Sequence, residues 1–184
     1  MSSTKIVKLD PENPEQNYIR EAAEILKSGG LVIMPTETVY GIAANMLNHK
    51  ALDRLYEIKK RPKDKLFSLH IAEKEKVEEF ANDIPVSAYK LIDKFWPGPL
   101  TLILKSKTQW SMGIRLPDNK IALRVIAGAG VPVVCPSANI SGSPAPINFQ
   151  DAIKDLDGLV DFAIDAGATK LGKESSVKLE KEFG

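Results

Sequence analysis

Apolar and polar positions along the chain change repeatedly between the two-residue spacing of strands and the spacing of amphipathic helices. Continuous apolar runs, typical of strands covered on both faces, alternate with segments that place their apolar residues on one helical face. The predicted strands cover residues 5–9, 31–34, 66–71, 100–105, 113–117, 131–135, 162–164 and 176–179. The predicted helices cover residues 14–28, 49–61, 73–82, 85–95, 121–127 and 148–156. This order predicts a mixed α/β sheet with helices packed on it, although residues 121–127 also fit a strand.

Asn and Pro residues mark several of the boundaries. Asn13 followed by Pro14 predicts the N-cap and first position of the first helix, and Asn48 predicts the N-cap of the second. The Pro-Gly-Pro turn at residues 97–99 leads into a strand, and its second prolyl bond is a candidate for the cis form. Trp96 is expected to be a core aromatic beneath this turn.

The composition limits the classes of protein to which the chain can belong. With 184 residues, 43% of them hydrophobic, residues 1–184 are expected to form a single globular domain. A formal net charge of +1 argues against a surface that grips nucleic acid throughout, so any polyanion contact must be local. The lone Cys135 cannot form an internal disulfide, and the sequence holds no apolar run of membrane-span length and no secretory signal. We therefore expect a cytoplasmic protein without membrane contact.

A basic cluster follows the second predicted helix. Five of the seven residues at 59–65 are cations, namely Lys59, Lys60, Arg61, Lys63 and Lys65. Such charges repel one another by roughly 1 kcal/mol per close pair in water, so a cluster that faces a cleft indicates a polyanion such as a phosphate chain. The alternative is a solvated helix end, where cations complement the helix dipole.

The Ser/Asn-rich stretch at residues 137–142 is a second candidate anion site, because hydroxyl, amide and backbone N–H groups together can hold an anion. It also fits an ordinary turn. Thr36, Glu37, Thr38 and Tyr40 follow the strand predicted at 31–34, where they form either a polar turn or a site for a small zwitterion.

Two further polar residues lie within predicted strands. His70 is either a satisfied core histidine or a ligand-binding one. Arg115 lies among apolar neighbours and needs an anionic or acceptor partner if it is buried, and a substrate carboxylate would serve.

Several kinds of site are excluded by what their chemistry requires. The sequence contains no Gly-rich string ending in Lys-Ser/Thr, as a P-loop would need. With His49, His70 and Cys135 as its only histidines and cysteine, the chain has no transition-metal constellation and no nucleophile pair. Catalysis without a covalent intermediate is therefore favoured.

Five motifs in order carry a resemblance to a known family. They are PTETVYG at residues 35–41, KKRPKDKLFSLHI at 59–71, FWPGPLTLIL at 95–104, GIRLP at 113–117 and SANISG at 137–142. Together they resemble the YrdC-type threonylcarbamoyl-AMP synthase family, whose closing elements are similar to DAG at 165–167 and ESSV at 174–177. The resemblance covers about residues 15–180 and implies a twisted mixed α/β sheet around a large basic cavity.

The resemblance also implies an enzyme of tRNA modification. Such an enzyme joins L-threonine, bicarbonate and ATP into L-threonylcarbamoyladenylate and pyrophosphate, and a partner transferase then modifies adenosine 37 of tRNA. Mg²⁺ would arrive with ATP and be held mostly by phosphate oxygens, without a protein metal site.

The matching positions carry the implied site residues. The implied catalytic residues are Lys59, Arg61, Ser137 and Asn139. The implied threonine site comprises Thr36, Thr38, His70, Arg115, Ser137 and Ser175. The implied ATP site comprises Lys59, Arg61, Lys65 and Asn139.

The sequence departs from the family pattern at three places. Ile147 and Ser176 replace a usual hydroxyl residue and a usual Thr, and the sequence ends at Gly184, before an Arg-Pro-Gly-like segment that supplies ATP with a further cation. Either the sequence is a piece of a longer chain, or another group replaces that Arg. The resemblance is to the short, single-domain type. Two alternative functions are an RNA-binding module that contacts tRNA or double-stranded RNA, and a carbamoyl-transfer domain of the hydrogenase-maturation type.

Overall fold

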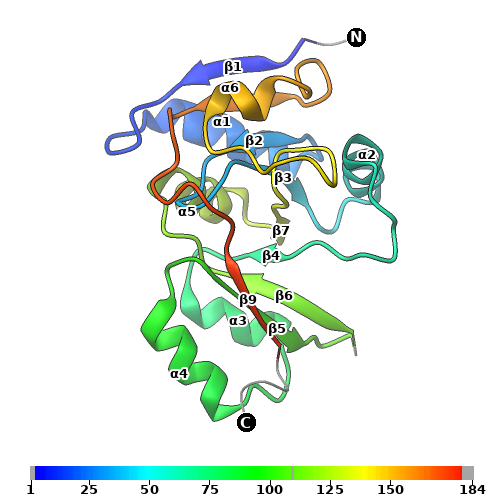
Figure 1. Cartoon of the computed structure of the whole chain (residues 1–184), viewed down its shortest axis with the longest axis vertical. Helices are drawn as coiled ribbons and strands as arrows, with labels where there is room; N and C mark the ends of the chain where they lie inside the picture. Colours follow the sequence, from blue (N-terminus) through cyan, green and yellow to red (C-terminus); the bar gives the residue numbers. More distant parts are fainter. Residues whose placement is uncertain (1–2, 109, 180–184) are drawn as a thin grey trace.

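The computed structural model describes residues 3–108 and 110–179, and within them one mixed sheet organises the fold (Figure 1). Its strands are β1 (Lys5–Lys8), β2 (Val32–Met34), β3 (Gly41–Asn45), β4 (Leu69–His70), β5 (Leu100–Lys105), β6 (Ser111–Arg115), β7 (Val133–Val134), β8 (Phe162–Asp165) and β9 (Ser176–Leu179). They lie in the order β1-β8-β2-β3-β7-β4-β6-β5-β9, with both parallel and antiparallel neighbours. The predicted mixed α/β architecture is confirmed.

Helices cover the sheet in separate groups. They are α1 (Gln16–Lys27), α2 (His49–Lys59), α3 (Val77–Phe80), α4 (Val86–Phe95), α5 (Lys120–Ala129) and α6 (Phe149–Ile153), with a 3-10 turn at Lys74–Lys76. Figure 1 shows α1 and α5 packed together, α2 and α6 at other positions on the upper part, and α3 and α4 beside β5 and β6 at the lower end.

Three hydrophobic clusters correspond to these groups. The first joins α1 and α5 to the sheet, the second places Leu55 of α2 and Phe149 of α6 against it, and the third packs Ile92 of α4 against β5 and β6. Each fully buried Leu or Ile contributes roughly 1.5–3 kcal/mol relative to exposure. The first two clusters therefore stabilise the part of the sheet that contains β2 and β3, and the third stabilises the part that contains β5 and β6.

Local capping explains where α2 and α5 begin. Asn48 Oδ1 accepts a hydrogen bond of 3.0 Å from the Ala51 N–H, as predicted, and Asn119 caps α5 in the same way. The prediction for the first helix is wrong by two residues, because Pro14 lies buried in the connection and α1 begins at Gln16. The helix favoured at 121–127 is confirmed as α5.

Several predicted elements are shorter than expected. The strand predicted at 131–135 is only Val133–Val134, and the helix predicted at 148–156 is only Phe149–Ile153. The strand predicted at 66–71 is only Leu69–His70, because the carbonyl of residue 66 accepts a hydrogen bond from Arg61 instead of pairing with a strand. The helix predicted at 73–82 divides into the 3-10 turn and α3.

Strand β3 was not predicted, because its sequence, GIAAN, is rich in small residues that favour strands weakly. Gly41 is required there, since a Cβ at this position would lie 2.4 Å from Cys135 Sγ. The cis prolyl bond is Trp96–Pro97, not the bond to Pro99. Trp96 is buried, as expected, and its indole N–H donates to the Leu100 carbonyl. No helix among the described residues has the length and apolar character to cross a membrane.

Candidate active site

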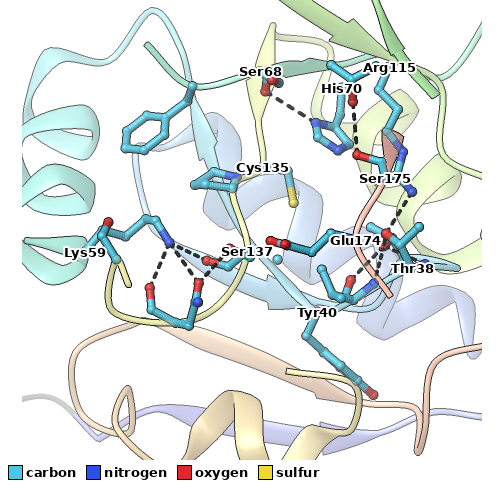
Figure 2. A pocket seen from close by; sticks show the side chains of 18 of the residues that line it. Thr38, Tyr40, Lys59, Ser68, His70, Arg115, Cys135, Ser137, Glu174 and Ser175 are labelled. Carbon is cyan, nitrogen blue, oxygen red and sulfur yellow. Dashed lines mark hydrogen bonds between the residues drawn. The ribbon is translucent and has the colours of Figure 1, made fainter. Parts of the chain in front are cut away.

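A cavity of about 570 Å³ opens where the central strands end, and Figure 2 shows the side chains that converge on it. Its polar lining comes from Thr36, Thr38, Tyr40, Lys59, Arg61, Ser68, His70, Thr101, Arg115, Ser137, Asn139, Ser141, Ser143, Glu174 and Ser175. These residues belong to widely separated parts of the chain. The fold therefore collects in one space the polar residues that follow several different strands.

Lys59, the last residue of α2, is buried beneath one wall of this cavity. Its Nζ donates to the Ser137 carbonyl at 2.6 Å, the Asn139 carbonyl at 2.7 Å and Asn139 Oδ1 at 3.2 Å. Burial, with a smaller contribution from Arg61, lowers the pKa of Lys59 to about 8. The ammonium has three N–H donors and three oxygen acceptors here, so Lys59 orients the 137–139 loop and contributes its charge without a spare donor.

Arg61 lies in the loop after α2, where Lys60 adopts a left-handed conformation with φ of 49°. Its guanidinium donates to the carbonyls of Lys65 and Leu66 at 3.0 and 3.2 Å and lies 5.4 Å from the centre of the Phe67 ring. These contacts hold the cation at the cavity wall. Lys65 contributes only its backbone carbonyl, which accepts a hydrogen bond from Arg61. The residue does not line the cavity, so its ammonium is not part of the site.

The 137–142 loop lies beside the end of α2, on the same wall as Lys59, and is tied together internally. Ser137 Oγ donates to Asn139 Oδ1 at 2.6 Å, and Asn139 Nδ2 donates to the Ser143 carbonyl at 2.6 Å. The backbone N–H of Ser141 donates to the Lys59 carbonyl at 2.9 Å. The basic cluster and this loop, predicted as two anion sites, therefore meet in one structure through Lys59.

The turn between β2 and β3 lies on the other side of the cavity and holds two hydroxyls in fixed positions. Thr36 Oγ1 donates to the Val39 carbonyl and accepts from the backbone N–H groups of Thr38 and Val39. It also lies 2.9 Å from Thr38 Oγ1. Thr36 is thus saturated by its own turn, whereas Thr38 retains capacity to accept a hydrogen bond from a ligand.

Arg115, at the end of β6, forms a buried ion pair with Glu37. Both side chains are at most 5% exposed, and Arg115 Nη2 contacts Glu37 Oε1 while also donating to Thr38 Oγ1 at 3.0 Å. The other carboxylate oxygen of Glu37 accepts the Asp118 N–H. Burial lowers the pKa of Arg115 to about 10, so the guanidinium remains charged at pH 7. The anionic partner expected for Arg115 is therefore present in the protein itself.

His70 and Ser175 lie on the same side of the cavity as Thr38 and Arg115. His70 pairs in register with Arg115 across β4 and β6, and burial lowers its pKa to about 4, so the imidazole is neutral at pH 7. Nδ1 lies 3.3 Å from the Ser68 carbonyl, which assigns the proton to Nδ1 and leaves Nε2 as an acceptor. Ser175 Oγ lies 3.2 Å from Thr101 Oγ1.

Of the residues assigned to the implied catalytic, threonine and ATP sites, all but Lys65 line the cavity. Glu37 was noted only as part of a polar turn, and the need of a buried Arg115 for an anion was the available signal for its role. Thr101 and Glu174 lie within the FWPGPLTLIL and ESSV motifs, but the sequence analysis gave neither residue a role in the site. The described residues contain no group of three or more His, Cys, Asp or Glu that could hold a metal ion, and Glu174 is the one carboxylate in the cavity lining.

Comparisons with known proteins agree with this geometry. The profile of the Sua5/YciO/YrdC family, described as "Telomere recombination", matches residues 24–180. A threonylcarbamoyl-AMP synthase of Pyrococcus abyssi is 42% identical over 175 residues, which cover 90% of this chain and 52% of that protein. A putative threonylcarbamoyl-AMP synthase of Methanocaldococcus jannaschii is 38% identical over a 192-residue alignment that covers 97% of this chain and 89% of that protein.

A solved structure of P. abyssi Sua5 complexed with L-threonine has a TM-score of 0.91 at 39% identity and is matched over 96% of this chain and 54% of that one. The chain therefore spans about half the length of the P. abyssi protein. Because the family profile matches most of the sequence and the fold agrees, this chain belongs to the Sua5/YciO/YrdC family.

Proposed function

We propose that this protein is an L-threonylcarbamoyladenylate synthase, a nucleotidyltransferase that uses L-threonine, bicarbonate and ATP. The observation that carries the proposal is that one cavity contains both a wall built on Lys59 and, facing it, a wall built on Arg115. One wall offers cations and a Ser/Asn loop, which suit phosphates, and the other offers hydroxyls and a neutral imidazole, which suit an amino acid. The similarity to a synthase of P. abyssi supports the same assignment.

The reaction has two steps. Bicarbonate first loses hydroxide to give CO₂, and the threonine amine nitrogen bonds to the carbon of CO₂ and loses a proton, giving a carbamate. A carbamate oxygen then bonds to the α-phosphorus of ATP, the bond from that phosphorus to the bridging oxygen breaks, and pyrophosphate leaves with the electron pair. Negative charge grows on phosphate oxygens, and in other enzymes one preorganised donor at such a position contributes about 3–4 kcal/mol.

For ATP, the proposed contacts come from Arg61, Ser137 and Asn139. Lys59 acts through its positive charge and by fixing the loop that carries Ser137 and Asn139, since its three donors already have acceptors. Arg61 lines the cavity and uses two of its nitrogens on the chain, which leaves donors for a phosphate. Mg²⁺ bound with ATP would neutralise part of the phosphate charge. Lys65 is proposed only as a long-range cation.

For threonine, the proposed contacts come from Thr38, His70, Arg115 and Ser175. Among the described residues, both side-chain contacts of Arg115 use Nη2, and neither Nη1 nor the buried Nε has a hydrogen-bond partner. The guanidinium thus keeps donors for a substrate carboxylate. His70 Nε2 offers an acceptor for the amine or hydroxyl, and Thr36 supports Thr38 without touching substrate.

The product is a mixed anhydride, which another enzyme must consume. We propose that a transferase passes its threonylcarbamoyl group to adenosine 37 of tRNA, and that residues 1–184 act as one catalytic domain. Direct contact of this chain with tRNA or double-stranded RNA is not required for that role.

The direct test is incubation of the protein with threonine, bicarbonate, ATP and Mg²⁺, followed by detection of pyrophosphate and the adenylate by mass spectrometry. Pyrophosphate release that depends on all three substrates is the expected result. Release with a carbamoyl donor in place of threonine would instead favour the carbamoyl-transfer alternative. Absence of turnover together with RNA affinity that falls steeply with salt would favour the RNA-binding module.

A further inference from the structure

Glu174 is an exposed residue that lines the cavity two positions before β9 (Figure 2). Strand β9 begins at Ser176 and pairs with β5. The Ser176 N–H donates to the Pro99 carbonyl at 2.9 Å. Successive side chains of an extended segment point to opposite sides. Figure 2 shows the consequence, since Ser175 lies on the Arg115 side while the Glu174 carboxylate points toward Ser137.

The carboxylate therefore faces the wall assigned to phosphates. Its charge is close enough to raise the pKa of Lys59, opposing the larger lowering by burial. No hydrogen bond or ion pair joins Glu174 to another residue in the described part of the chain. A bare carboxylate in this position repels a triphosphate, so the arrangement favours nucleotide binding only if a cation lies between them.

The protein cations do not fill that role. Arg115 is matched by Glu37, and the three donors of Lys59 are occupied by loop oxygens. The remaining donors of Arg61 are assigned to a phosphate, and Arg61 forms no ion pair with Glu174 in the described part of the chain. Mg²⁺ in nucleotide sites is usually bound by one or two carboxylates together with substrate phosphate oxygens and waters. A single carboxylate that faces the phosphate wall fits this pattern, whereas a metal site made of protein ligands alone does not.

We propose that Glu174 is the protein ligand for the divalent cation that enters the cavity with the nucleotide. This inference rests on the proposed function and adds to it a residue that links the metal to the protein. It predicts thermodynamic coupling, in which Mg²⁺ and nucleotide each raise the affinity for the other. It also predicts that the coupling passes through the charge of one side chain.

The experiment is calorimetric titration with an ATP analogue that has a methylene group between its α- and β-phosphorus, in Mg²⁺ and in EDTA. The proteins compared are the unaltered chain, Glu174→Gln, Glu174→Asp and the control Glu75→Gln, which makes the same charge change at an exposed site outside the cavity. For the unaltered chain and the control, Mg²⁺ is expected to raise nucleotide affinity by about tenfold or more. For Glu174→Gln this factor should fall to about threefold or less, with metal-free binding unchanged or tighter because the repulsion is gone.

A second readout uses Mn²⁺, whose electron paramagnetic resonance reports bound metal. With the ATP analogue present, Glu174→Gln should bind Mn²⁺ more weakly, and Glu174→Asp should recover part of the affinity. Full retention of the Mg²⁺ factor in Glu174→Gln would overturn the proposal. Equal loss of nucleotide affinity with and without Mg²⁺ would also overturn it, because that result assigns the carboxylate to ribose hydroxyls. Failure of the unaltered chain to bind nucleotide would reject the proposed function itself, a result distinct from either.

Discussion

The two walls of the cavity each contain a buried cation, and they stabilise it differently. Lys59 is surrounded by carbonyl and amide oxygens, which satisfy its donors but leave its charge without a counterion. Arg115 is paired with the carboxylate of Glu37. One wall therefore presents a net positive charge to the cavity, and the other presents a nearly neutral, rigid set of donors and acceptors.

This difference assigns the ligands. An uncompensated buried charge attracts an anion strongly, which suits the phosphates, where charge grows during the reaction. A compensated pair discriminates by hydrogen-bond geometry, which suits an amino acid whose carboxylate and ammonium already cancel. The comparison therefore predicts that loss of the Glu37 carboxylate mainly lowers stability, whereas loss of the Lys59 charge mainly lowers activity.

The largest effect is expected from breaking the ion pair. Glu37→Gln leaves Arg115 charged and buried without a counterion, so the free energy of unfolding should fall by about 3–5 kcal/mol. Urea denaturation measures it. The control is the double variant Glu37→Gln/Arg115→Met, which removes both charges and should be less destabilised than the sum of the single changes. Strict additivity would show that the two side chains do not interact.

Removal of the uncompensated cation should affect catalysis more than folding. Lys59→Met should lower the rate of adenylate formation by about a hundredfold or more, measured as pyrophosphate release. It should also lower the free energy of unfolding by about 1–3 kcal/mol, because loop carbonyls lose their donor. Arg61→Ala should lose comparable activity with little change in stability, since its partners lie near the surface.

The matched control is Lys60→Met, which removes the neighbouring exposed cation. It should retain normal activity and stability. Equal activity of Lys59→Met, Arg61→Ala and Lys60→Met would identify the basic cluster as a solvated helix end, the alternative considered from the sequence.

The lowered pKa of Lys59 predicts opposite pH dependences for binding and folding. Because the folded pKa is about 8, nucleotide affinity should fall by up to about tenfold per pH unit above pH 8, as Lys59 loses its charge. Between pH 8 and the ordinary Lys pKa, 10.5, the unfolded chain binds the additional proton, so this group's contribution makes the folded state more stable as pH rises. Both trends should be reduced in Lys59→Met, as calorimetry and urea titrations at each pH will show.

The smallest effect concerns selection of the amino acid. Valine resembles threonine in shape but lacks the hydroxyl, so it would leave Thr38 or His70 without a partner. We expect valine to bind about tenfold more weakly or worse, measured by calorimetry. Equal affinities would remove the hydroxyl site from the Arg115 wall.

Local physics explains which parts of the fold were predictable. Asn48 identified a helix start because its side chain caps the next turn, and apolar runs identified most strands. Strand β3 escaped prediction because its Gly and Ala residues fit a close contact with β7 that the local sequence does not reveal.

The site was predicted to a similar extent. A buried Arg115 was expected to need an anion, but the sequence could not identify Glu37 as its partner. The turn that carries Glu37 and Thr38 is far from Arg115 along the chain, with 77 positions between Thr38 and Arg115. Similarly, the cluster at 59–65 signalled cations, yet the hydrogen bonds that turn Lys59 inward depend on a loop folded far away along the sequence.

The position of β9 beside β5 has a consequence for biosynthesis. The cavity draws residues from Thr36 in the first quarter of the sequence to Ser175, immediately before the last described strand. On the ribosome, a nascent chain can assemble the core around β2 and β3 while Ser175 is still unmade or within the exit tunnel. The nucleotide and amino-acid walls then become one compartment only when β9 adds to the sheet, so substrate binding has to wait until the residues of β9 have left the ribosome.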